Sequence, residues 1–423
     1  MKLHIENFAK IKDTTIELKG LTVIAGNNNT GKSTIGKVLY SIFRGLSNID
    51  ARIKKDVHDT VRNAFINTFK NLVIEEKDVE AIIDGKATPE DVFQSSFLKS
   101  AGGAEVTAAQ LSAVSDLYMP TIRERISQVM SLPPEEIAKE ILLKVFKCVF
   151  HNQFHPLKTD APHALIEFTI KDDVNQLAFG SERWGKAIVT KLFSKAYFIT
   201  NPDILNLLND RDFAANEAVF SRSLDKYSFE LAKKLCEDVS SVSNTDRAID
   251  DARLRPIIED LDAVIKGHVS KDAASDMSLT EEGNSEPTKF GNLSMGLKSF
   301  VLLRMMLERH ILSDKDVLIL DEPEIHLHPE WQVAYARAIV RLQKVYGLTV
   351  LITTHSPFFV NALQRFCITV GSPDDTNFYL SKRDERYSGY CSLESLEHKT
   401  GAIFRTFNLA YDAIEPSCYP EGL

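Results

Sequence analysis

The chain has 423 residues, 44% of them hydrophobic, so it can bury one large core or two modest ones, and a disordered or fibrous protein is excluded. No stretch approaches the roughly 20 uncharged apolar residues that a bilayer-crossing helix needs, and the N-terminus carries charges where a signal peptide needs an apolar run. We therefore expect a cytoplasmic protein without a membrane partner.

The formal net charge is -9, so the chain lacks the overall cationic field that holds nonspecific DNA-binding proteins to phosphates. Short basic clusters, such as the one at residues 52–55, lie among acidic residues at helical spacing and indicate a solvated helix face. Nucleic acid is thus a possible partner that the net charge does not support. Five widely spread cysteines without a C-x-x-C pair indicate reduced thiols and no structural zinc site.

The first 45 residues predict strands, a loop and a helix. Apolar and polar residues alternate over residues 3–18, and the apolar run at 21–25 indicates a buried strand. A loop begins at Gly26, and apolar residues then recur with helical period over 35–43. The local unit is therefore strand, glycine loop, helix.

The segment from Gly45 to His155 predicts helices. Hydroxyl residues precede proline and acids at 88–91 and 131–135, as in the first turn of a helix. No apolar heptad is sustained over several turns, so we expect a compact helical insertion and not a long coiled-coil arm. Prolines are expected to interrupt the helical pattern at positions 89, 120, 133, 134 and 156.

Strands return after this insertion. Residues 163–180 predict two strands around a Lys-Asp-Asp turn, and residues 196–200 predict another. Helices are expected from about 202 to 267, and the polar stretch 270–292 predicts a hairpin or an exposed loop.

Two short apolar strands, 317–320 and 348–353, flank a helix at 330–346, which indicates a βαβ unit with a parallel sheet. The expected fold class is therefore α/β, with a mixed sheet. We expect the chain to form a head domain from residues 1–45 and 271–370, with a helical insertion at 46–155. Residues 156–270 are expected to add strands and helices to the head or to the insertion, and residues 371–423 to form a C-terminal extension.

Residues 26–33 match the phosphate-binding pattern G-x-x-x-x-G-K-[ST] without a mismatch, between a strand and a helix as the mechanism requires. In such a loop backbone N–H groups surround the β-phosphate, Lys32 brings a cation to the β and γ oxygens, and Ser33 ligates magnesium. A chance glycine-rich turn is the alternative. The candidate nucleotide-binding residues here are Gly26, Asn27, Asn28, Asn29, Thr30, Gly31, Lys32, Ser33 and Thr34.

Asp321 and Glu322 end an apolar strand, and ligands of α/β sheets bind at this carboxyl end. We expect Asp321 to hold magnesium, directly or through water, and Glu322 to polarise the attacking water as general base. Two acids in a surface turn would be the alternative if the loop at Gly26 were absent.

A third motif, Asn292 to Phe300, contains Leu-Ser-Met-Gly and precedes a helix. Ser294 alone would read as a helix N-cap. With the other motifs, the chain resembles the ABC ATPase superfamily of P-loop NTPases. That resemblance implies that Ser294 and Gly296 contact the γ-phosphate of an ATP molecule bound to the partner subunit.

His355 follows the last strand in the run Thr-Thr-His-Ser-Pro. A histidine at a strand end is often structural, but the resemblance implies that His355 contacts the γ-phosphate and orients the water. The run after Glu322 contains His326 and His328, yet no further ligands are evident for a metal site. The resemblance implies instead a dimer-facing loop, in which Glu324 and His326 communicate across the interface.

The motifs resemble the RecF, SMC and OLD group more than transporter ATPases, although the match covers well under half of the chain. The chain leaves no room for the TOPRIM domain of OLD nucleases after the Thr-Thr-His-Ser-Pro run, and it most resembles stand-alone ATPases of anti-phage systems such as Septu or PARIS. This resemblance implies a magnesium-dependent ATPase that works as a head-to-tail homodimer, or as a larger oligomer of dimers, and controls a separate nuclease or toxin. The alternatives are a RecF-like DNA-repair ATPase and a transporter subunit. The glutamine loop of the superfamily is not identifiable.

Overall fold

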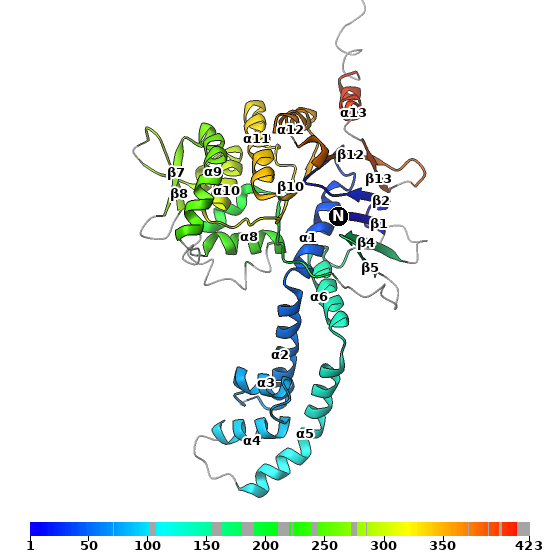
Figure 1. Cartoon of the computed structure of the whole chain (residues 1–423), viewed down its shortest axis with the longest axis vertical. Coiled ribbons are helices and arrows are strands. Elements are labelled where there is room, and N and C mark those ends of the chain that lie inside the picture. The colour runs from blue at the N-terminus through cyan, green and yellow to red at the C-terminus, as the bar shows by residue number, and fades with distance from the viewer. Residues whose placement is uncertain are drawn as a thin grey trace, which may run out of the picture. The chain divides into compact units, whose positions relative to one another are not determined.

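The chain forms two compact units, which are shown in Figure 1. The first, here the head, contains Met1–Gly45, Leu143–Lys186 and Ser194–Leu423, and the second, here the helical unit, contains Leu46–Leu142 and Ala187–Phe193. The helical unit thus ends before the predicted limit at 155 and takes in a short later segment. This computed structural model describes residues 1–70, 72–100, 107–153, 163–179, 190–209, 220, 224–237, 244–271, 277–284, 286–370, 372–387, 389–396 and 400–412.

A ten-stranded mixed sheet forms the centre of the head, with the order β5-β4-β1-β2-β13-β12-β3-β11-β10-β6. Strands β12, β3, β11, β10 and β6 run parallel, whereas β5, β4, β1 and β2 form antiparallel pairs. The strands are β1 (Lys2–Phe8), β2 (Ile11–Glu17), β3 (Leu21–Gly26), β4 (Ala164–Ile170), β5 (Asp173–Phe179), β6 (Ala196–Ile199), β10 (Val317–Asp321), β11 (Thr349–Thr354), β12 (Thr376–Arg383) and β13 (Cys391–Ser395). The predicted α/β class with a mixed sheet is confirmed.

The place of β12 and β13 differs from the sequence-based expectation. Residues 371–423 were expected as an extension, but β12 pairs with the loop-bearing strand β3 and β13 pairs with β2. Five of the eight residues of β12 form a buried stretch, Phe378–Ser381 with Thr376, as a central strand requires. These two strands therefore join the antiparallel half of the sheet to the parallel half.

The head contains α-helices and short 3₁₀ helices, most of which share a hydrophobic core with parallel strands of the sheet (Figure 1). They are α1 (Lys32–Leu46), α8 (Lys226–Cys236), α9 (Asn244–Ile265), α10 (Met295–Glu308), α11 (Pro329–Tyr346), α12 (Pro357–Val370) and α13 (Gly401–Asp412), with the 3₁₀ helices η1 (Pro202–Asn209), η3 (Phe290–Asn292) and η4 (Pro373–Asp375). Helix α11 begins at a proline and ends at Gly347, whose φ of 59° is the left-handed conformation of a C-terminal cap. The predicted β10-α11-β11 unit is confirmed, with parallel strands.

A small three-stranded sheet completes the described part of the head. It consists of β7 (Gly267–Lys271), β8 (Met277–Glu281) and β9 (Thr288–Lys289), all antiparallel. This confirms the hairpin that the polar stretch predicts, and it leads directly into η3 and α10.

The helical unit has a core of its own, built from apolar residues such as Phe65, Phe93 and Ile122. Its helices are α2 (Ile49–Thr68), α3 (Glu76–Ile83), α4 (Pro89–Ser100), α5 (Ala108–Ser131) and the first part of α6 (Pro134–Val149). The start signals before Pro89 and Pro134 are confirmed. Pro120 does not interrupt the pattern, because α5 continues through it while Met119 and Ile122 on either side are buried in the core.

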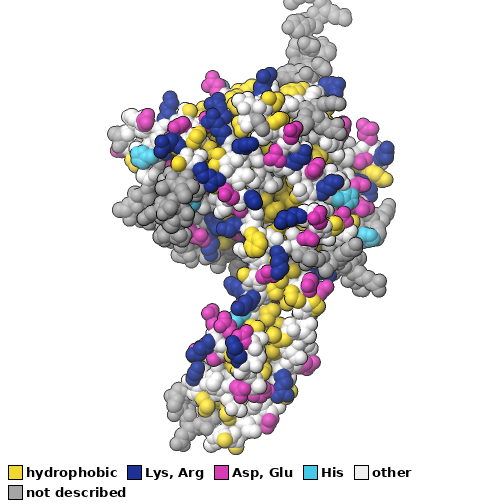
Figure 2. Space-filling model, viewed as in Figure 1, with side chains coloured by type: hydrophobic (Ala, Val, Ile, Leu, Met, Phe, Trp, Pro, Cys, Tyr) yellow, Lys and Arg dark blue, Asp and Glu magenta, His cyan; other side chains and the backbone are white. Residues whose placement is uncertain are grey.

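Within the described residues, no helix combines the length and the apolar character that a membrane crossing needs. On the face shown in Figure 2, Lys and Arg side chains are interspersed with Asp and Glu side chains.

Candidate active site

The phosphate-binding loop connects β3 to α1 at the middle of the sheet, where β3 lies between β11 and β12. Gly26 has a φ of +156°, and a Cβ atom there would lie 2.4 Å from the carbonyl oxygen of Ser381 in β12. Gly31 has a φ of +82°, and its Cβ would lie 2.7 Å from Cδ1 of Ile11. Both positions therefore need glycine, because a side chain would be strained and would collide with neighbouring strands.

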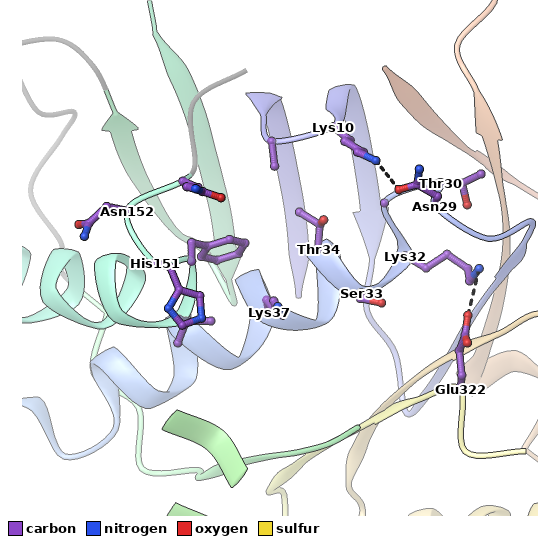
Figure 3. A pocket seen from close by; sticks show the side chains of 15 residues that line it. Lys10, Asn29, Thr30, Lys32, Ser33, Thr34, Lys37, His151, Asn152 and Glu322 are labelled. Carbon is purple, nitrogen blue, oxygen red and sulfur yellow. Dashed lines mark hydrogen bonds and ion pairs between the residues drawn. The ribbon is translucent and has the colours of Figure 1, made fainter. Parts of the chain in front are cut away.

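Lys32 is directed into this loop and is only 4% exposed. Its Nζ donates hydrogen bonds of 2.9 Å to the carbonyl oxygens of Gly26 and Asn27. It also lies 3.4 Å from Oε1 of Glu322, the ion pair drawn in Figure 3. The lysine ammonium is thus held between the loop backbone and one of the two acids at the end of β10.

Asp321 is hydrogen-bonded from two sides. Ser33 Oγ donates to its Oδ1 over 2.9 Å, and Thr353 Oγ1 donates to the same oxygen. Asp321 and Thr353 are register partners in the parallel strands β10 and β11, which explains why they meet. Burial raises the pKa of Asp321, and the hydrogen bonds from Thr353 and Ser33 oppose this effect.

Glu322 adopts a left-handed backbone conformation, with a φ of 51°. Its N–H donates to the carbonyl oxygen of Thr353 over 2.9 Å, which holds the turn in place after the strand ends. Such a conformation costs roughly 1 kcal/mol or more in a residue other than glycine. The carboxylate reaches Lys32 through Oε1 and lies 3.5 Å from Nδ1 of His355 through Oε2.

A pocket of about 680 Å³ opens beside the loop and α1, within the size range of small-molecule sites (Figure 3). Its lining residues include Lys10, Asn29, Thr30, Gly31, Lys32, Ser33, Thr34, Lys37, Phe150, His151, Asn152, Gln153 and Glu322. A second cavity of about 100 Å³ lies on the other side of the acids, where Thr200 and Asn201 follow β6. The candidate residues of the loop and the acids are therefore brought together in one site.

The donor set of this site suits a magnesium nucleotide. Ser33 Oγ and Asp321 Oδ1 are adjacent oxygen ligands of the kind that Mg²⁺ prefers, and the loop presents the N-terminus of a 15-residue helix to anions. Lys32 adds a positive charge at the same place.

Ser294 and Gly296 are outside this pocket. Ser294 is exposed and caps α10, because its side chain accepts a hydrogen bond from the N–H of Leu297. Gly296 is buried, and a Cβ there would lie 2.7 Å from the carbonyl oxygen of His326. Lys298, one turn later, is 4% exposed and donates to Asp203 over 2.9 Å. Of the described residues that line the pocket beside the phosphate-binding loop, none belongs to the Ser294 loop of the same chain.

Several residues in or near the site were not assigned from the sequence. Thr353 lies in a recognised motif, and the rule that parallel strands end at the same edge could have assigned it to Asp321. Lys10 and the segment 151–153 belong to no sequence motif. They reach the pocket from the turn between β1 and β2 and from the segment that follows α6. Glu324 differs from its expected dimer-facing position, since it is only 2% exposed, whereas His326 is exposed.

Residues 1–360 match the family model described as AAA ATPase domain. The chain belongs to this ATPase family. The match spans the phosphate-binding loop, both acids and His355, and it confirms the predicted ATP hydrolase.

Two relatives with known names align along most of the chain. One is the Retron Vc95 probable ATPase of Vibrio cholerae serotype O1 biovar El Tor, 23% identical over 89% of this chain and 73% of the relative. The other is the Retron Ec83 probable ATPase of Escherichia coli, 23% identical over 91% of this chain and 72% of the relative.

Solved structures with similarity include the SMC head domain from Thermotoga maritima, with a TM-score of 0.36 and 12% identity over 93% of this chain and 97% of that one. Another is the Smc head domain with an extended coiled coil, derived from Pyrococcus furiosus. It has a TM-score of 0.42 and is 12% identical over 96% of this chain and 98% of that one.

Proposed function

We propose that this ATPase binds magnesium ATP in the pocket beside the Gly26 loop and hydrolyses it slowly between two copies of its head. The observation that carries this proposal is the contact of loop and acids: Ser33 lies 2.9 Å from Asp321, and Lys32 lies 3.4 Å from Glu322. Residues from positions 32 and 322 meet only if the motifs form one site.

The chain's own residues carry distinct steps of the reaction. The loop N–H groups and Lys32 bind and orient the β- and γ-phosphates. Glu322 accepts the proton of the attacking water, the water oxygen bonds to the γ-phosphorus, and the bond to the β–γ bridging oxygen breaks to release ADP. His355, 3.5 Å from Glu322, orients the water and contacts the γ-phosphate.

Ser33 and Asp321 would hold the magnesium ion. When bound, this ion neutralises charge on the β- and γ-phosphate oxygens.

Two copies are required in this proposal because Ser294 and Gly296 do not line the pocket of their own chain. In a head-to-tail dimer the exposed Ser294 hydroxyl and the N-terminus of α10 of one copy face the γ-phosphate bound to the other. ATP then favours the closed dimer, because it contacts both copies only in that state.

We further propose that closure and hydrolysis control a separate effector protein, a nuclease or toxin, in anti-phage defence. The support is the alignment with two proteins named as retron ATPases, together with the motif resemblance to defence ATPases. The helical unit, which has its own core, is the part that we assign to effector contact.

The central test is a pair of substitutions in the site. Lys32→Ala should abolish ATP binding in calorimetry, because it removes the cation at the phosphates. Glu322→Gln should retain ATP binding but lower kcat by at least about 100-fold, because the amide cannot accept the proton. Glu330→Gln, at an exposed position on α11, is the matched control and should leave both unchanged. Normal hydrolysis by Glu322→Gln would remove Glu322 from its role.

The biological test expresses the chain with its genomic neighbours and challenges the cells with phage. Protection should disappear with Lys32→Ala. Equal plaque formation with and without the wild-type chain would contradict the defence role, and hydrolysis stimulated by DNA with a steep salt dependence would favour the DNA-repair alternative.

A further inference from the structure

A buried acid lies directly behind His355. Glu324 follows β10 by three residues and is only 2% exposed. Its Oε1 accepts a 2.5 Å hydrogen bond from Thr354 Oγ1 and a 3.1 Å hydrogen bond from the backbone N–H of His355. Its other oxygen, Oε2, is buried and has no hydrogen-bond partner among the residues that the structure describes.

The arrangement of Glu324 is unfavourable if this residue serves only to stabilise the fold. Burial of a carboxylate is unfavourable unless its oxygens are hydrogen-bonded, and an unsatisfied buried oxygen adds to the cost. Glu324 thus has a capacity to accept hydrogen bonds that its present contacts do not use.

Nδ1 of His355 lies close to the same carboxylate, 3.5 Å from Oε1 of Glu324. Among the described residues this nitrogen is also buried without a hydrogen-bond partner. The His355 side chain as a whole is 38% exposed. Because Nδ1 is buried, the exposed surface of this side chain belongs to its other atoms.

Nδ1 lies at the same 3.5 Å from Oε2 of Glu322. A single N–H cannot donate well to both carboxylates at once, so one of them must be the partner. Glu322 is 22% exposed, contacts Lys32 and lines the nucleotide pocket, whereas Glu324 is buried. Burial raises the pKa of Glu324, but the two groups that reach its Oε1 are donors, which oppose this effect and suit an accepting carboxylate.

We infer that Glu324 is a positioning residue, which accepts the Nδ1–H of His355, directs Nε2 to the nucleotide and leaves Glu322 to the attacking water. A carboxylate that binds one ring nitrogen fixes both the tautomer and the orientation of a histidine. This inference rests on the proposed function, in which His355 orients the water.

The test is a double-mutant cycle in hydrolysis. Glu324→Gln keeps the shape of the side chain but replaces the carboxylate with a neutral amide, which is a weaker acceptor for the Nδ1–H of His355. We therefore expect kcat to fall by about 10-fold or more, while the KM for ATP changes little. In the His355→Ala background the same substitution should cause no further loss, because the group that Glu324 positions is absent. Equal losses in both backgrounds, or no loss in either, would overturn the inference.

Thr354→Val is the matched control, since it removes another hydrogen bond to the same Oε1. It should lower kcat less than Glu324→Gln does. An equal effect of the two variants would assign the loss to local packing and count against positioning.

A measurement on the wild-type protein covers the case in which Glu324→Gln does not fold. Long-range ¹⁵N–¹H spectra of histidine-labelled protein, with His355→Ala for assignment, should show the proton of His355 on Nδ1. A proton on Nε2 alone would overturn the inference. The proposed function is tested separately by Lys32→Ala. If this variant still hydrolysed ATP, the assignment of the nucleotide site to the Gly26 loop would be wrong.

Discussion

Asp321 shows how much of this site depends on one oxygen atom. Its Oδ1 accepts from Ser33 on the loop side and from Thr353 on the sheet side. Burial disfavours the charged form of Asp321, so a cation or donors must offset that cost. A magnesium ion shared by Ser33 and Asp321 would supply the offset from the loop side, whereas Thr353 orients the carboxylate.

This difference predicts distinct magnesium dependences. Ser33→Ala should raise the Mg²⁺ concentration for half-maximal hydrolysis by about 10-fold or more, because it removes an oxygen ligand. Thr353→Val should raise it less, because it removes hydrogen bonds to Asp321 and to the N–H of Glu322 but no oxygen ligand of the ion. Titration of activity with Mg²⁺ measures both, and equal half-saturation in Ser33→Ala and wild type would contradict the assignment.

At this scale the sequence predicted residues that lie in contiguous motifs. Lys32, Ser33, Asp321 and Glu322 each adjoin an apolar strand or helix, so their positions follow from local pattern and from the edge at which parallel strands end. The burial of Glu324 was not predictable. It depends on the contact with Thr354, which lies 30 residues away and in another element.

Among the elements, α1 and α8 are joined by a polar network in the C-terminal half of α1. Arg44 on α1 donates to both oxygens of Glu230 on α8, over 2.5 and 2.7 Å, and Tyr40 donates to the same carboxylate over 2.9 Å. Burial acts to raise the pKa of Glu230, but the hydrogen bond from Arg44 and its charge outweigh it, so the pKa lies below its ordinary value. Helix α8 is thereby fixed to the helix that carries Lys32.

Glu230→Gln should therefore destabilise the head in a pH-dependent way. We expect a loss of about 1 to 3 kcal/mol in the free energy of unfolding at neutral pH. Because the folded-state pKa is lowered, the contribution of Glu230 is present above its ordinary pKa of 4.5 and disappears as the pH falls through the folded-state value. Urea unfolding of variant and wild type should therefore converge in acid.

Tyr40→Phe is the control for this network, since it removes one neutral donor and no charge. Its effect should be smaller, at about 1 kcal/mol. A Glu230→Gln effect that stays constant from neutral pH to acid would show that the ionised carboxylate is not the stabilising group.

Elements also show where sequence reasoning is limited. The β10-α11-β11 unit was predictable because consecutive strands with a helix between them form a parallel pair. The insertion of β12 and β13 between β2 and β3 was not, since it depends on pairing between strands more than 350 residues apart, such as Leu21 with Thr376. Pro120 was misjudged because tertiary packing on both sides of it outweighs the lost backbone hydrogen bond.

For the whole molecule, the proposed dimer predicts that ATP changes the state of association. Glu322→Gln with ATP should sediment as a dimer, because ATP that is bound but not hydrolysed stays between the two copies and holds them together. Adding Ser294→Arg should keep the protein monomeric by placing a bulky side chain at the exposed N-terminus of α10, while ATP binding by calorimetry remains. A monomer in Glu322→Gln with ATP would contradict the dimer.

The strands β12 and β13 also bear on how the protein is made. Strand β12 pairs with the strand that carries the phosphate-binding loop and β13 pairs with β12, yet the ribosome synthesises both after the other described strands of the large sheet. Until they emerge, the nascent chain presents β3 with an open edge, which is a template for pairing with other chains. The ability to use nucleotide should thus arise late in translation, and a chaperone that shields this edge would raise the yield of active protein.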